Sequence, residues 1–164
     1  MIAKFLAVFF ISMVPLVELR FAVPFGLSSA ITGEALPIIP LYLVAILGNM
    51  LPVPLIFFFA RKVLVWGSKK KFIGKFFTFC LTKGEKAGKK LTEKTGQSVY
   101  IALFLFVGIP IPGTGAWTGT LAASLLNLDF KKSSIAVMCG VILAGIIMGL
   151  GAAGVFGAIG AATA

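Results

Sequence analysis

The 164-residue sequence contains no histidine, two cysteines and five acidic residues. The absence of imidazole excludes histidine bases, histidine-containing triads and nearly all zinc sites. Cys80 and Cys139 lie far apart in apolar surroundings, so they form neither a CxxC motif nor a disulfide framework, and we expect both to pack as small apolar side chains. Because five acids without histidine offer few acid–base pairs, we expect no catalytic residue, no metal, no cofactor and no enzyme activity.

Charged residues are also scarce, at 12% of the chain, whereas a soluble domain carries about 25%. Hydrophobic residues make up 59%. The formal charge of +10 would ordinarily suggest a nucleic-acid partner, but too few polar residues remain to cover a surface that displays the lysines, so nucleic acid is excluded. Together with long uncharged runs, this composition predicts an all-α integral membrane protein.

Most of the positive charge lies in one segment, residues 61–98. It contains eleven of the fifteen basic residues and two glutamates, and therefore carries +9 of the formal +10. This segment is predicted to form an amphipathic helix at the cytoplasmic membrane surface, with its lysines against anionic lipid headgroups. A solvated basic loop that marks the cytoplasmic side is the alternative interpretation. The apolar residues that recur at helical spacing are Phe72, Ile73, Phe76, Phe77 and Cys80.

The basic segment divides the chain into two halves with the same plan, in which an apolar stretch broken in the middle precedes an unbroken one. The runs beside each break have 11 to 13 residues, whereas a helix needs about 20 residues to cross a bilayer. The broken stretches therefore predict re-entrant helical hairpins, and the unbroken ones predict membrane spans. The single domain 1–164 then comprises repeat 1–60 (hairpin 5–31, span 36–60), connector 61–98 and repeat 99–164 (hairpin 99–128, span 135–160).

An alternative treats both broken stretches as full crossings, giving four spans. With the connector in the cytoplasm, a re-entrant 99–128 returns Lys131 and Lys132 to the cytoplasm, whereas a crossing exports them. Charge bias therefore favours the re-entrant arrangement, although that places Lys4 outside. Because its halves begin on opposite faces, this arrangement is an inverted-topology repeat, a plan on which many secondary transporters are built.

The first break places two unlike charges, Glu18 and Arg20, at membrane depth. Each costs roughly 2.5 to 3.5 kcal/mol on insertion scales, which marks both as candidate substrate- or ion-binding residues. Pro24 removes the hydrogen bond that the Arg20 carbonyl would accept, so we expect the backbone to open beside the arginine and the two charges to converge on one cavity. A Glu18–Arg20 salt bridge that only pins the hairpin is the alternative.

The second break, Pro-Ile-Pro-Gly-Thr-Gly-Ala-Trp-Thr-Gly at 110–119, is rich in glycine and opens a helix. Glycines let backbone amides face a ligand, and a helix N-terminus favours anions. No G-K-[ST] follows and no strand is predicted before it, so we do not expect an NTP-binding loop. A plain helix-breaking turn is the alternative. The predicted binding residues are Pro110, Pro112, Gly113, Thr114, Gly115, Trp117 and Thr118.

The predicted spans contain two further features, a candidate binding residue and a helix-packing motif. Asn49 offers an amide at membrane depth, either as a binding residue or as a helix–helix hydrogen bond. Gly145 and Gly149 form a GxxxG motif typical of close helix packing. Its partner is either a helix of the same chain or a second copy, so a homo-oligomer stays open.

Three motifs together resemble the small multidrug export protein family of prokaryotes. They are Glu-Leu-Arg-x-x-x-Pro at 18–24, Leu-Gly-Asn at 47–49 and Pro-x-Pro-Gly-Thr-Gly-Ala-Trp-Thr-Gly at 110–119. That family looks like a remote relative of the DedA or VTT-domain superfamily, described as two inverted re-entrant hairpins that each precede a span. The resemblance implies a multi-pass protein of the prokaryotic plasma membrane, with hairpin-tip residues Glu18, Arg20, Pro24, Pro112, Gly113 and Thr114.

These observations lead us to expect a small membrane transporter that couples export or translocation of a small molecule or anionic lipid headgroup to protons or another small ion. Glu18 would carry the proton, and Arg20 with the amides of 113–115 would contact the anion. The DedA-type resemblance implies an alternative, a lipid scramblase or polyprenyl-phosphate flippase. A non-transporting membrane scaffold is the second alternative.

Overall fold

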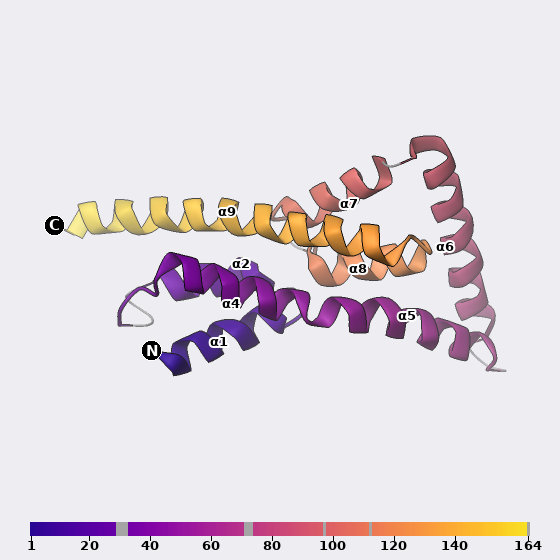
Figure 1. The fold of residues 1–164 in the computed structure, drawn as a ribbon, viewed down its shortest axis with the longest axis horizontal. Coiled ribbons are helices and arrows are strands. Elements are labelled where there is room, and N and C mark those ends of the chain that lie inside the picture. The colour runs from indigo at the N-terminus through magenta and orange to yellow at the C-terminus, as the bar shows by residue number, and fades with distance from the viewer. Residues whose placement is uncertain (29–32, 71–73, 97, 112, 164) are drawn as a thin grey trace.

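The structure is a computed structural model that describes residues 1–28, 33–70, 74–96, 98–111 and 113–163. These residues form α-helices and connecting turns, and no strand is present among them (Figure 1). The prediction of an all-α protein is therefore confirmed for this part of the chain. The helices are α1 (Ile2–Met13), α2 (Glu18–Leu27), α4 (Ile38–Met50), α5 (Pro52–Ser68), α6 (Gly74–Thr95), α7 (Ser98–Gly108), α8 (Ala116–Leu125) and α9 (Phe130–Thr163).

In the described part of the chain, two stretches are long and apolar enough to cross a membrane, Ile38–Ser68 and Phe130–Gly154. The first consists of α4 and α5, which join at Leu51 because Pro52 begins a new helix there. It reaches Ser68 rather than the predicted residue 60, because Arg61 and Lys62 favour helix and their long side chains can reach toward the interface. Its 31 residues rise about 46 Å, more than the hydrocarbon thickness of about 30 Å.

Both broken stretches form pairs of short helices. α1 runs toward the middle of the molecule and α2 returns, while α7 and α8 do the same from the opposite end (Figure 1). The four helices have 10 to 12 residues each, so the length of each is about half the thickness of the hydrocarbon layer of a bilayer.

The turn of the first hairpin lies before Glu18, between α1 and α2. Leu16 and Glu18 have positive φ angles of 69° and 53°, which cost a residue with a side chain about 1 to 2 kcal/mol. The expected opening of the backbone beside Arg20 is therefore not observed, because Arg20 and Pro24 both lie inside α2. Proline removes a single bond from this short helix, and the preceding positive-φ residues already make the turn.

α6 lies crosswise over the end of the bundle at which α5 ends and α9 begins (Figure 1). The predicted connector 61–98 is thus divided, since its first eight residues continue α5 and its largest part is one helix of 22 residues. Phe77 packs against Gly67 of α5, where a larger residue would overlap the ring. Phe76 and Phe79 are exposed. Phe72 and Ile73 lie outside the described residues.

The face of α9 that contains Gly140, Gly145 and Gly149 packs against other helices of the same chain. The Tyr42 hydroxyl of α4 donates to the Gly145 carbonyl at 2.8 Å, and a Cβ on Gly149 would overlap that hydroxyl. Gly140 lies against Val107 of α7 in the same way. These glycines therefore contact residues of α2, α4 and α7 of the same chain, and a homo-oligomer stays a prediction.

Candidate functional site

Glu18 is the first residue of α2 and only 3% of it is exposed. Its carboxylate accepts two backbone hydrogen bonds from the start of α8. Ala116 N–H donates to Oε2 at 3.1 Å, and Trp117 N–H donates to Oε1 at 3.0 Å. A helix begins with unpaired N–H groups and a partial positive charge. The Glu18 carboxylate accepts hydrogen bonds from two of these groups and offsets the charge.

Arg20, on the same helix, binds the other side of the second break. Its guanidinium donates to the Ile111 carbonyl at 2.6 Å, the Val107 carbonyl at 3.1 Å and the Ile109 carbonyl at 3.2 Å. A fourth bond reaches Thr114 Oγ1 at 2.8 Å. Because α7 ends at Gly108, these carbonyls belong to the negative end of α7 and the turn after it.

The two opposite charges therefore bind opposite helix ends of one break. Glu18 contacts the positive end of α8, and Arg20 contacts the negative end of α7. In the described contacts, both side chains bind the second break rather than each other, so the direct salt bridge is not found, although the two charges are close enough to interact electrostatically. The tips of the two hairpins meet through these contacts.

Glycine is required at the contact point with Glu18. Gly115 precedes α8 with a φ of 145°, and a Cβ there would overlap the Glu18 carboxyl group. Gly113 also has a positive φ, 86°, but no other atom lies within 4 Å of its Cβ position. Gly113 therefore serves the turn, whereas Gly115 also lets the carboxylate approach the α8 amides.

Trp117 links this site to an apolar groove. Its indole N–H donates to the Met13 carbonyl at the end of α1, at 3.1 Å. The hydroxyl of Thr118 donates to the Gly115 carbonyl at 3.4 Å. Trp117 and Thr118 line a groove of about 320 Å³, whose other walls are residues of the first hairpin turn, α5 and α8: Pro15, Leu16, Ile56, Phe59, Ala60 and Leu121.

Asn49, near the end of α4, reaches the same carboxylate. It is 2% exposed, and its side chain lies within hydrogen-bonding reach of Glu18. Its Oδ1 has no hydrogen-bond partner among the described residues. The amide therefore faces the meeting point of the tips, beside the junction of α4 and α5.

The structure brings together Glu18, Arg20, Asn49, Thr114, Gly115 and Trp117 through the contacts above, and Thr118 follows them in α8. Pro24 lies in α2 away from the described bonds, and Pro110 lies between two carbonyl groups that bind Arg20. Pro112 lies outside the described residues.

The sequence did not point to most partners of these charges, which are the carbonyls of Val107, Ile109 and Ile111 for Arg20 and the amide of Ala116 for Glu18. Every one of them is a backbone group. The motif at 110–119 was the available signal, since its glycines and prolines imply helix ends with unpaired backbone groups. Among the described residues, no group of three or more cysteine or acidic side chains could hold a metal ion.

The comparisons with known proteins give one finding. A family model with the description "Putative small multi-drug export protein" matches residues 18–147, from the first residue of α2 into α9. The matched region contains both sides of the contact, Glu18 with Arg20 and the break at 110–119. No curated protein and no solved structure matches the chain.

Proposed function

The chain belongs to the small multi-drug export protein family, and from this premise we propose that it is a multi-pass membrane transporter whose translocation site is the junction of two re-entrant hairpins. Family membership and the apolar helices make it a membrane protein. In the proposed arrangement α1–α2 and α7–α8 enter from opposite faces, so the halves form an inverted repeat and the tips meet at half depth.

The distribution of charge supports this arrangement. The basic residues of α6 and the first turn of α9, with Lys131 and Lys132, lie at one end of the bundle (Figure 1). Residues 33–37, which lead into α4, lie at the other end, and the sequence between α2 and α4 contains no basic residue (Figure 1). With the basic end in the cytoplasm of a prokaryotic cell, the chain obeys the positive-inside rule.

The contact between Glu18 and the start of α8 carries the proposal. An ionised carboxylate fills the anion-binding end of α8, so an anionic substrate cannot bind there at the same time. Protonation removes the charge and weakens both hydrogen bonds, which frees the amides of Ala116 and Trp117 for a substrate anion. Proton and anion are thereby coupled, because each protonation state favours one occupancy. Arg20 remains bonded to α7 and keeps the tip in place.

The groove beside Trp117 indicates the substrate class. Its volume of about 320 Å³ is near the lower limit for small-molecule sites, and its walls are almost entirely apolar. An amphipathic substrate fits this geometry, with an anionic group at the α8 amides and an apolar body in the groove. Both an exported small molecule and a lipid with an anionic headgroup satisfy this description. No enzymatic step is part of the proposal.

The test is flux in liposomes that contain the purified chain. We expect acidification after a pH jump in the presence of an amphipathic anion, and its loss in Glu18→Gln, which keeps the shape but cannot release a proton. Glu34→Gln is the matched control, because Glu34 is an exposed glutamate outside the site. Equal flux through Glu18→Gln would exclude coupling through this residue.

The same liposomes distinguish the alternatives. Labelled lipid that crosses the bilayer without a gradient, in the wild type and in Glu18→Gln alike, would indicate a scramblase or flippase of DedA type. If folded protein gives neither acidification nor lipid movement, the remaining interpretation is a membrane scaffold that does not transport. Thermal unfolding of each variant verifies that the comparison is made between folded proteins.

A further inference from the structure

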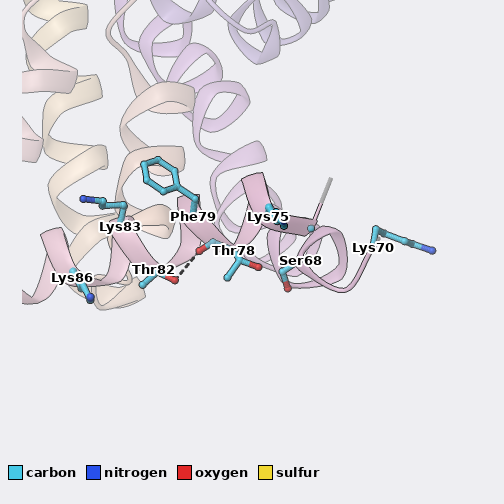
Figure 2. A pocket seen from close by; sticks show the side chains of 9 residues that line it. Ser68, Lys70, Lys75, Thr78, Phe79, Thr82, Lys83 and Lys86 are labelled. Carbon is cyan, nitrogen blue, oxygen red and sulfur yellow. Dashed lines mark hydrogen bonds between the residues drawn. The ribbon is translucent and has the colours of Figure 1, made fainter. Parts of the chain in front are cut away.

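A groove of about 600 Å³ lies at the corner between the end of α5 and the start of α6 (Figure 2). Four lysines line it, and the described lining residues include no acidic side chain. It is separate from the Glu18 site, because α6 lies over the end of the bundle (Figure 1). The lining lysines are Lys70, Lys75, Lys83 and Lys86.

Aromatic rings position two of these lysines without neutralising them. The Lys70 ammonium lies 4.6 Å from the centre of the Trp66 ring, and that of Lys83 lies 5.7 Å from the centre of the Phe79 ring. Such contacts orient the side chain and leave the full positive charge. The described lining of the groove therefore carries four basic side chains and no acidic one.

Hydroxyl groups and a helix end add further anion-binding capacity. Ser68, Thr78 and Thr82 line the groove, and Figure 2 shows their side chains on the same side of α6 as Lys86. The hydroxyls of Ser68 and Thr82 donate to backbone carbonyls within their own helices, at 2.7 Å each, and can rotate toward a ligand. Gly74, the first residue of α6, is also in the lining, so the positive helix end borders the groove.

We propose that this groove is a binding site for the phosphate headgroup of an anionic phospholipid. Its place in the fold favours a lipid over a soluble anion. α6 crosses the end of the membrane-length helices, where headgroups lie, and large apolar side chains beside the groove are exposed, with Trp66 and Phe79 at 59% each. A ligand with a phosphate and acyl chains matches both the lysines and the aromatic residues. The inference does not depend on what the chain transports.

The experiment measures lipid binding to the full chain in detergent by native mass spectrometry, with phosphatidylglycerol, phosphatidylcholine and inorganic phosphate as probes. The groove variant is Lys75→Gln with Lys86→Gln. The matched control, Lys62→Gln with Lys89→Gln, removes the same charge from exposed positions outside the groove lining. We expect the groove variant to bind phosphatidylglycerol about tenfold more weakly, and the control to change by less than about twofold.

Three results would overturn the proposal. Equal losses in the two variants would mean that the charge acts diffusely and not through the groove. Equal affinity for phosphatidylcholine would remove the requirement for an anionic headgroup. Inorganic phosphate that binds as tightly as the lipid would identify a soluble anion as the ligand. The four substituted lysines, Lys62, Lys75, Lys86 and Lys89, are all exposed. We therefore expect both variants to unfold at the wild-type temperature, which verifies that they are folded.

Discussion

The backbone amide of Trp117 donates to Oε1 of Glu18 at 3.0 Å, although the two residues are 99 positions apart in the sequence. This bond joins the tip of one helical hairpin to the tip of the other. With the parallel bond from Ala116, it makes the Glu18 carboxylate the N-terminal cap of α8. A charge that is costly at membrane depth is thus stabilised by a helix end that would otherwise have unpaired donors.

The close approach of Gly115 to Glu18 predicts that Gly115→Ala destabilises the fold more than Gly113→Ala. Both positions have positive φ, so both substitutions strain the backbone, by about 1 kcal/mol or more. Only at 115 does the added methyl group also displace the Glu18 carboxylate. Thermal unfolding in detergent measures the difference, and equal shifts in the melting temperature would contradict this role of Gly115.

The guanidinium of Arg20 is expected to be energetically coupled to Thr114. Arg20→Gln removes bonds to three carbonyls, so we expect a loss of about 2 to 4 kcal/mol. Thr114→Val removes one acceptor of Arg20 and should cost less. The double variant should be less destabilised than the sum of the single variants, by about 1 kcal/mol. Strict additivity in thermal unfolding would show that the two side chains act independently.

The packing of Tyr42 against α9 predicts that Tyr42→Phe reduces the destabilisation caused by Gly149→Ala. Gly149→Ala places a methyl group in the position of the Tyr42 hydroxyl, and should lower the melting temperature. Tyr42→Phe removes that hydroxyl together with its bond to Gly145. In the Tyr42→Phe background, Gly149→Ala should therefore cost less than in the wild type. Gly151→Ala is the control, because its Cβ position has no neighbour within 4 Å. An equal cost of Gly149→Ala in both backgrounds would argue against this packing.

The proposed re-entrant hairpins predict opposite accessibility for Lys131 and Glu34. With Cys80 and Cys139 replaced by alanine, Lys131→Cys should react with an impermeant maleimide only after cells are permeabilised. Glu34→Cys should react in intact cells, since Glu34 precedes α4 and Lys131 lies in the first turn of α9, and these two helices begin at opposite ends of the bundle (Figure 1). Labelling of Lys131→Cys from outside would instead favour four full crossings.

Composition and the length of apolar runs were enough to predict an all-α membrane protein. A chain with this little charge can satisfy its backbone in a bilayer only through helices or a closed barrel, and the long uncharged runs select helices. The breaks were also visible, because Glu18 with Arg20 in the first half, and the prolines and glycines of 110–115 in the second, interrupt apolar runs too short to span. Helix bounds were less predictable. Arg61 and Lys62 continue α5, because the cost of a charge depends on its depth, which the sequence does not state.

The sequence by itself determined the helical class, the membrane environment and the unusual cost of Glu18 and Arg20. Only the tertiary structure decided what these charges bind. Apart from the Thr114 hydroxyl, their partners are backbone amides and carbonyls, which nearly every residue carries and no side-chain pattern identifies. The same holds for Gly149, whose partner Tyr42 is defined by the packing of α4 on α9. Residue types state which groups need partners, whereas the position of each helix end in space determines which partner each group finds.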